Sequence, residues 1–273
     1  MQLYQHQIEG LEATEGMNHV AYFWDMGLGK TFAGSEKMMQ LGAKVNLVVC
    51  QKSKVQDWVD HFLINYSQTE FSVYDLTDQK QFKKFMHNLL DGFKQETFLG
   101  IINYDLIWRR PSIMQIQNFT LLLDESSLIQ NESAKRSKFI LKMQPKNVIL
   151  LSGTPTGGKY ERLWSQMHLL GWTISKQLYW KQFINVEYLD TVGKSIPIVT
   201  GYKNVDRLKR KMAEHGCQFL KTDEVFDLPD QVFQKVRIPA SKEYRIFKKY
   251  RIVGIKDDLT LVGDTTLTKM LYE

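Results

Sequence analysis

The chain has 273 residues, of which 43% are hydrophobic and 24% are charged, with a formal net charge of +6. This balance is ordinary for a globular protein with a substantial core, built as one large domain or as one domain with an appendage. No apolar run is long enough to span a membrane, and the N-terminus carries no secretory signal. The only cysteines, Cys50 and Cys217, make neither a disulfide framework nor a zinc motif, so we expect a reducing compartment and no structural zinc. Lys and Arg are scattered, so charge alone favours a polyanionic partner only weakly.

Short apolar runs alternate with longer helical patterns through the first 170 residues. The expected strands are His19–Trp24, Val45–Cys50, Phe71–Tyr74, Phe98–Ile102, Thr120–Leu123 and Asn147–Leu151. The expected helices are Thr31–Leu41, Lys54–Ile64, Gln79–Leu90, Tyr104–Trp108, Ala134–Met143 and Tyr160–Leu170. This alternation predicts an α/β fold with a doubly wound, mostly parallel sheet, in which ligands collect beyond the carboxyl ends of the strands.

The alternation weakens after residue 170. Residues 171–230 are rich in aromatic and charged side chains and are interpreted as a helical insertion or subdomain. A further strand is expected over Val232–Ile238, followed by a helix over Ser241–Tyr250. We therefore divide the chain into a core over 1–170, the insertion over 171–230, and a return to the core over 231–273.

The strongest chemical signal follows the first expected strand and opens the first expected helix. It consists of Asp25, Met26, Gly27, Leu28, Gly29, Lys30 and Thr31. Glycines let the main chain curl so that its N–H groups face a phosphate chain, and the helix N-terminus adds partial positive charge. Lys30 can then reach the β- and γ-phosphates of ATP, while the Thr31 hydroxyl can bind Mg²⁺. Trp24 stands where the full phosphate-loop pattern has its first glycine, and an accidental Gly-Lys-Thr is the alternative interpretation.

Two adjacent carboxylates, Asp124 and Glu125, follow the apolar run Leu121–Leu123. Charged groups are costly at the end of a buried strand unless they bind something positive. Asp124 can hold Mg²⁺, and Glu125 can polarise the water that attacks the γ-phosphate. The alternative is that Asp124 only caps the next helix, but the phosphate-loop pattern upstream favours the nucleotide site.

A third polar cluster, Ser152 to Pro155, also follows an apolar strand. These residue types commonly form simple turns. The functional alternative is a loop beside the γ-phosphate that senses ATP through the hydroxyls of Ser152 and Thr154. Trp24 and Trp58 are expected to pack in the core rather than stack on bases.

The order DMGLGKT, LLLDESS and LLSGTP resembles the Swi/Snf-type branch of the superfamily 2 helicase-like, DNA-dependent ATPases. The resemblance covers essentially the whole chain. It implies a three-layer RecA-like (P-loop NTPase) lobe that uses ATP and Mg²⁺ and acts on duplex DNA. It also implies a second RecA-like lobe, in the same protein or in a partner chain, with 231–273 beginning the linker to it.

Further residues gain expected roles only through this resemblance. The segment around Leu3–Gln7 is similar to the family's adenine-recognition motif, which implies that Gln7 reads the adenine edge. The family's nucleic-acid contacts would fall on Lys52, Ser53, Asn103 and Tyr104. One departure is Ser126-Ser127, where many relatives have Ala-His after the two carboxylates.

These observations predict the N-terminal ATP-binding lobe of a motor that translocates on double-stranded DNA and remodels rather than unwinds it. An isolated lobe is expected to be a weak ATPase. The alternatives are a nucleotide-switched protein-binding module and a strand-separating DNA or RNA helicase. We expect a cytoplasmic protein of a bacterium or a phage-infected cell, or a nuclear one if the source is eukaryotic.

Overall fold

The computed structural model describes residues 2–66, 71–90, 97–191, 194–227, 234–256 and 259–262. The chain divides into two compact units, Met1–Asp227 and Leu228–Glu273. Across the described residues, every helix is too short or too polar to cross a lipid bilayer.

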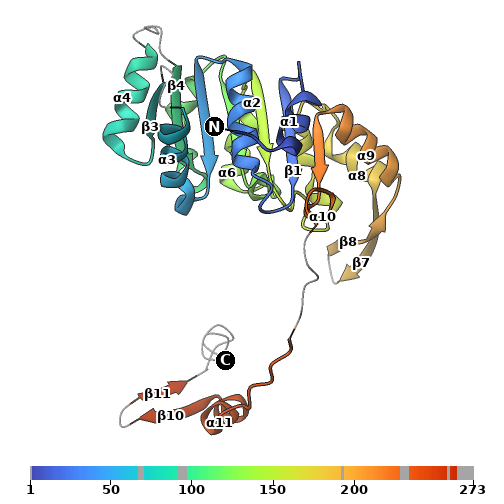
Figure 1. Cartoon of the computed structure of the whole chain (residues 1–273). Helices are drawn as coiled ribbons and strands as arrows, with labels where there is room; N and C mark the ends of the chain where they lie inside the picture. The colour runs from blue at the N-terminus through green and yellow to red at the C-terminus, as the bar shows by residue number, and fades with distance from the viewer. Residues whose placement is uncertain are drawn as a thin grey trace. The chain divides into compact units, whose positions relative to one another are not determined.

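The first unit is built on a seven-stranded sheet with the order β3-β4-β2-β5-β6-β1-β9, in which every pair is parallel (Figure 1). The strands are β1 (His19–Trp24), β2 (Val45–Cys50), β3 (Phe71–Asp75), β4 (Thr97–Asn103), β5 (Thr120–Asp124), β6 (Asn147–Leu151) and β9 (Cys217–Leu220). The first six lie within a residue of the predicted ranges, which confirms the parallel α/β fold.

Helices cover both faces of this sheet. One face carries α1 (Gln5–Glu12), α2 (Lys30–Leu41) and α3 (Val55–Asn65). The other carries α4 (Gln79–Leu90), α5 (Tyr104–Ile107), α6 (Lys135–Lys142), α7 (Trp164–Leu169), α8 (Lys176–Phe183) and α9 (Val205–Glu214). Short 3-10 helices lie at Lys52–Lys54, Pro111–Gln115, Ser126–Ile129 and Tyr160–Arg162.

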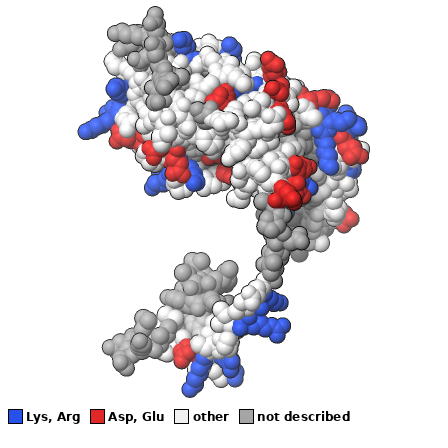
Figure 2. Space-filling view, viewed as in Figure 1, with Lys and Arg blue, Asp and Glu red and all other residues white. Residues whose placement is uncertain are grey.

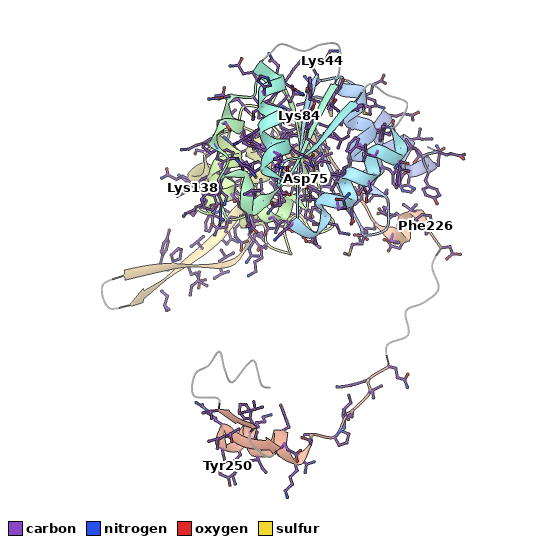
Figure 3. All side chains as sticks on the ribbon, turned by 90° about the vertical axis from the view of Figure 1, so that its left-hand side faces the viewer. Lys44, Asp75, Lys84, Lys138, Phe226 and Tyr250 are labelled. Atoms are coloured by element: carbon purple, nitrogen blue, oxygen red, sulfur yellow. The ribbon has the colours of Figure 1, made fainter. Side chains whose placement is uncertain are left out.

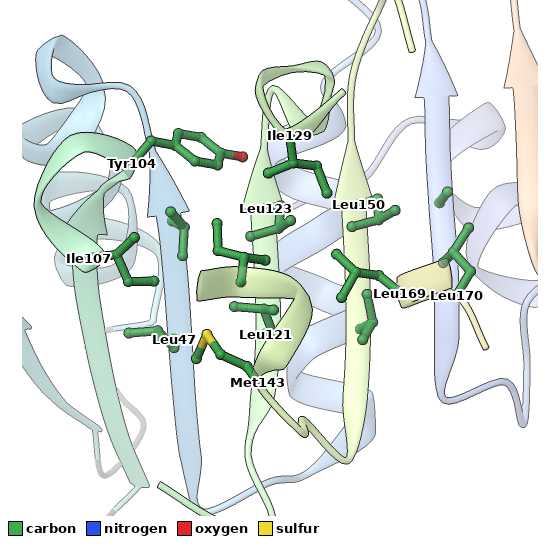
Figure 4. Close-up of a cluster of buried hydrophobic side chains, with 14 of the residues drawn as sticks. Leu47, Tyr104, Ile107, Leu121, Leu123, Ile129, Met143, Leu150, Leu169 and Leu170 are labelled. Atoms are coloured by element: carbon green, nitrogen blue, oxygen red, sulfur yellow. The ribbon is translucent and has the colours of Figure 1, made fainter. Parts of the chain in front are cut away.

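The sheet is buried because its strands are apolar on both sides. Along β5, Leu121 and Leu123 point into one core and Leu122 into the other. Successive side chains of a strand face opposite sides, so a continuous apolar run fills two cores at once. Figure 4 shows the first of these cores, where Leu121, Leu123 and Leu150 lie beside Ile129 and Met143.

Residues 171–230 contain helices, as predicted, and also strands that the sequence analysis did not predict. A hairpin of β7 (Ile184–Thr191) and β8 (Lys194–Tyr202) follows α8 and extends away from the sheet (Figures 1 and 3). Strand β9 then joins the main sheet beside β1, and α10 (Thr222–Val225) follows it. This segment is therefore partly an extension of the core sheet rather than only a helical insertion.

The second unit contains α11 (Lys242–Tyr250) and a hairpin of β10 (Ile252–Lys256) and β11 (Leu259–Val262). The predicted helix is confirmed. Of the predicted strand, residues 234–238 have no regular structure, and 232–233 lie outside the described residues. Figure 2 shows exposed Lys and Arg side chains gathered on this unit, whereas both signs are mixed over the visible face of the first unit. The prediction that 231–273 return to the RecA-like lobe stays a prediction.

His61 on α3 links this helix to α2, on the face of the sheet that both helices cover. The Asn65 amide lies 3.3 Å from His61 Nδ1, and His61 Nε2 lies 2.9 Å from Ser35 Oγ. An amide N–H can only donate, so Nδ1 accepts and Nε2 carries the proton. Burial lowers the pKa of the His61 imidazole, in line with a neutral ring.

The stability of this contact should depend on pH. Since the folded-state pKa of His61 is depressed, the unfolded chain takes up the proton first, and stability is lost as the pH falls through about 6.5. We expect the unfolding free energies of wild type and His61→Gln, measured in urea from about pH 8 to about pH 5.5, to converge on acidification. A gap that stays constant or widens would contradict a buried neutral imidazole.

Candidate nucleotide-binding site

The loop between β1 and α2 has the conformation that a phosphate loop needs. Gly27 and Gly29 have φ values of 86° and 71°, in the left-handed region that favours glycine. Gly29 is the N-cap of α2, and Lys30 begins the helix. In the first turn of α2, the Phe32 N–H donates to the Gly29 carbonyl oxygen at 3.0 Å, which leaves the N–H groups of Lys30 and Thr31 to bind an anion at this end.

Gln7 fixes this loop from α1. Its Nε2 donates to the carbonyl oxygens of Leu28 and Gly29 at 3.2 and 3.4 Å, and its Oε1 accepts from the Tyr4 N–H at 3.0 Å. The side chain of Gln7 is buried. The structure therefore shows Gln7 holding the loop, and its role in reading adenine stays a prediction.

Gly29 leaves no room for a side chain. A Cβ atom on Gly29 would lie 2.1 Å from Gln7 Nε2, whereas one on Gly42, which also has positive φ, would meet nothing within 4 Å. Each Gly→Ala substitution should cost about 1–2 kcal/mol of conformational energy. We expect only Gly29→Ala also to weaken nucleotide binding, by about tenfold or more, because Gln7 must release the loop. Thermal unfolding and nucleotide titration of the two variants would test this, and equal affinities would contradict it.

Lys30 lies across the start of the loop. Its Nζ donates to the carbonyl oxygens of Trp24 and Asp25 at 2.9 and 3.0 Å. Burial lowers the pKa of the Lys30 ammonium, and the carboxylates around it, Glu125 foremost, act in the opposite direction. The ammonium is thus held at the site by weak neutral acceptors, which a phosphate oxygen can replace.

Asp124 is the last residue of β5, and one strand, β6, separates β5 from β1 in the sheet. Its Oδ2 accepts from Trp58 Nε1 at 2.9 Å, and its carbonyl oxygen accepts from the Tyr104 hydroxyl at 2.8 Å. Burial raises the pKa of the Asp124 carboxyl, and the Trp58 hydrogen bond lowers it. Trp58 is buried, as predicted, but it is also a donor to this carboxylate, which the sequence analysis missed.

A cavity of about 510 Å³ joins these elements. Its lining residues are Met26, Gly27, Gly29, Lys30, Thr31, Gln51, Lys54, Asp57, Trp58, Asp124 and Glu125. The structure therefore brings together the phosphate loop and both carboxylates, which are far apart in the sequence. An ammonium suits phosphates, and hydroxyl and carboxylate oxygens are the ligands that Mg²⁺ prefers. The residues present fit a magnesium nucleotide.

The loop after β6 contacts this site. Ser152 Oγ donates to Glu125 Oε2 at 3.3 Å and accepts from the Thr154 N–H at 3.2 Å. Ser152 is buried, whereas Thr154 is exposed. Only Ser152 therefore touches the carboxylate directly, and the coupling roles of both residues stay predictions.

Two of the predicted loop residues lie outside the cavity lining. Leu28 is 1% exposed and packs in the core, so its side chain does not face a ligand. The Asp25 carboxylate accepts from the Thr222 N–H at 3.1 Å, so it binds the start of α10. These two side chains support the loop, whereas Met26 is exposed at its rim.

The four residues predicted to contact nucleic acid fall into two groups. Lys52 and Ser53 are exposed where β2 ends. Asn103 and Tyr104 are 6% and 2% exposed, respectively, and the Tyr104 hydroxyl is occupied by the Asp124 carbonyl. Their side chains are therefore buried away from a nucleic acid in this conformation, and Tyr104 positions the carboxylate strand instead. The nucleic-acid roles that the resemblance implies for these four residues stay predictions.

Residues 14–270 match the family model of the SNF2-related domain. The CHD3-type chromatin-remodeling factor CHR7 of Arabidopsis thaliana is 22% identical over 276 residues, which span 95% of this chain and 22% of that protein. The chromatin-remodeling ATPase INO80 of Candida glabrata is 28% identical over 178 residues, which span 62% of this chain and 11% of that protein.

Two solved structures from Sulfolobus solfataricus share the fold. The SWI2/SNF2 ATPase core in complex with dsDNA has a TM-score of 0.59 at 20% identity, covering 81% of this chain and 45% of that one. The SWI2/SNF2 ATPase core domain has a TM-score of 0.57 at 22% identity, covering 84% and 46%. The chain thus spans less than half the length of each of these relatives. Because the family match extends over nearly all of its residues, the chain belongs to the SNF2-related domain family.

Proposed function

We propose that this chain is the N-terminal ATP-binding lobe of a motor that couples MgATP hydrolysis to translocation on double-stranded DNA. The observation that carries the proposal is the single cavity that joins Lys30 and Thr31 to Asp124 and Glu125. A phosphate loop alone would bind an anion. A phosphate loop facing two carboxylates at a strand end has the parts needed for hydrolysis.

Binding would use the loop and the start of α2. The main-chain N–H groups around Gly29 and the Lys30 ammonium would hold the phosphates. The Thr31 hydroxyl and the Asp124 carboxylate would hold Mg²⁺, and Trp58 keeps one oxygen of that carboxylate oriented. When bound, the metal supplies positive charge to the phosphate oxygens.

Hydrolysis would use Glu125 as the general base. Its carboxylate would accept a proton from the attacking water, while the Ser152 hydroxyl fixes one of its oxygens. Phosphoryl transfer is also accelerated by an arginine near the transferred group, by about 10³–10⁵. The described residues that line the cavity include no arginine. A second RecA-like lobe, in the same protein or in a partner chain, would supply it.

Double-stranded DNA is the proposed track. The support is family membership, the solved relative described in complex with dsDNA, and exposed Lys52 and Ser53 at the edge of the sheet where the cavity opens. A lysine there can neutralise a backbone phosphate without reading sequence. We propose duplex remodelling rather than strand separation.

The 273-residue chain should bind MgATP but turn it over slowly, with little stimulation by duplex DNA. Isothermal titration and phosphate release with and without a duplex would test this. Brisk DNA-stimulated hydrolysis by this chain alone would contradict the need for a second lobe.

A protein that contains both lobes should displace the third strand of a DNA triplex without separating duplex strands. Strand displacement would favour a helicase instead. MgATP binding without DNA affinity when the second lobe is supplied would favour a nucleotide-switched protein-binding module.

A further inference from the structure

Gln166 on α7 joins two segments of the candidate site. Its side chain is fully buried, and its amide has partners at both ends. The Oε1 atom accepts from Ser126 Oγ at 2.8 Å, and the Nε2 atom donates to the Pro155 carbonyl oxygen at 2.6 Å. Ser126 directly follows the carboxylate pair, and Pro155 closes the loop that begins at Ser152.

The direction of this bridge is fixed by chemistry. The carbonyl oxygen of Pro155 can only accept, so Nε2 must face it. Oε1 therefore faces Ser126, and the Ser126 hydroxyl must donate. A reversed amide would place its oxygen against the Pro155 carbonyl oxygen, two acceptors together in a buried position, which is costly.

The bridge joins the two segments without involving the Glu125 carboxylate, which is the proposed general base. The direct route is the 3.3 Å contact of Ser152 with the Glu125 carboxylate, which would be altered when that carboxylate binds water. By contrast, Ser126 is attached to the main chain of Glu125. Glu125 has a φ of 53°, unusual for a non-glycine residue, so its main chain is held in place by its surroundings.

We propose that Gln166 is a positioning residue that transmits the nucleotide state from the main chain at Glu125 and Ser126 to the loop over residues 153–158. The inference rests on the proposed function, because it assumes that a nucleotide occupies the cavity. A shift of Ser126 on nucleotide binding would move the Gln166 amide and, through it, Pro155.

The outer side of this loop borders a second cavity of about 610 Å³. Thr154, Pro155 and Gly157 line it on the loop side, and Lys209 and Phe219 line it on the side of α9 and β9. A displaced Pro155 would change the shape of this cavity. The bridge thus connects the segment that carries the carboxylates to a surface outside the nucleotide site.

Amide hydrogen exchange of the 273-residue chain can report this transmission. The N–H groups of Thr154, Gly158 and Lys159 are hydrogen-bonded within the loop, so their exchange follows its opening. Exchange would be measured with and without a slowly hydrolysed MgATP analogue, alongside analogue affinity and thermal unfolding. In wild type we expect the analogue to change exchange at these amides.

Gln166→Met keeps the side-chain length but removes both hydrogen bonds. Ser126→Ala removes the same bridge from the other end and serves if the first variant fails to fold. Each should reduce the analogue-dependent change at least about fivefold, with analogue affinity within about threefold of wild type. The double variant should be no worse than either single variant, because both break one link.

Gln130→Met is the matched control. Gln130 Nε2 donates to the same Pro155 oxygen at 2.9 Å, but no hydrogen bond joins its side chain to Ser126 in the described structure. It should keep the analogue-dependent change. If Gln166 had a purely structural role, Gln166→Met would instead raise the exchange rates of the loop amides equally with and without the analogue.

The outcomes separate the two proposals. If wild type does not bind the analogue, the proposed function is wrong. If it binds but the loop does not respond, or if the loop responds as strongly in Gln166→Met and Ser126→Ala as in wild type, Gln166 does not transmit the nucleotide state.

Discussion

Lys30→Ala is expected to weaken MgATP binding by about 10- to 100-fold. A hydrogen bond to a charged group contributes about 1.5–3 kcal/mol, and Lys30 is a half-buried cation that lines the cavity. The fold should persist, because Lys30 lines the cavity and water there can take the place of its ammonium beside the Trp24 and Asp25 carbonyl oxygens. Isothermal titration with MgATP measures the loss directly.

Lys54→Ala provides the control for this experiment. Lys54 lines the same cavity, but it is 57% exposed and forms a surface ion pair with Asp57. Exposed pairs of this kind contribute little, so we expect less than about a threefold change in affinity. Equal losses in the two variants would mean that Lys30 acts only through the general charge of the cavity, against the proposed phosphate contact.

Glu125→Gln should leave MgATP affinity nearly unchanged and slow hydrolysis by about 10²–10⁴-fold, the usual contribution of a general base. The amide keeps the size of the carboxylate and can still accept from Ser152, but it cannot take a proton from water. Single-turnover hydrolysis with protein in excess of ATP would detect even slow cleavage.

Ser152→Ala separates proton transfer from orientation. It removes the hydroxyl that contacts Glu125 Oε2 but keeps the carboxylate, so hydrolysis should slow by a smaller factor, about tenfold. If Glu125→Gln cleaved ATP at the wild-type rate, another group would have to be the base. If Ser152→Ala were the slower variant, orientation rather than proton transfer would limit the rate.

The first six strands were predictable because each is a short, mostly apolar run between longer helical patterns. The β7–β8 hairpin was not, since its exposed Tyr188, Leu189 and Ile198 mix with charged residues and give no clear alternation. Strand β9 was also missed, because only four residues form it and its place depends on pairing with β1, far away in the sequence. The structure thus differs from the prediction where tertiary contacts outweigh local pattern.

The same division holds for the site. Lys30, Thr31, Asp124 and Glu125 were predictable because each belongs to a contiguous motif at a strand end. Trp58 was expected only to pack, and its hydrogen bond to Asp124 joins residues 66 positions apart. Gln166 gave no signal, because a single glutamine in a helix of mixed polar and apolar residues shows its role only when its two partners are in place.

Asp25 connects the phosphate loop to the end of the first unit. Its N–H donates to the Leu220 carbonyl oxygen at 2.9 Å, and its carboxylate accepts from the Thr222 N–H at 3.1 Å. Both partners come shortly before Asp227, where the first unit ends. Tension on the following chain would pass through these two hydrogen bonds to the phosphate loop. A mechanical load there would therefore bear directly on the loop that we propose to hold the nucleotide.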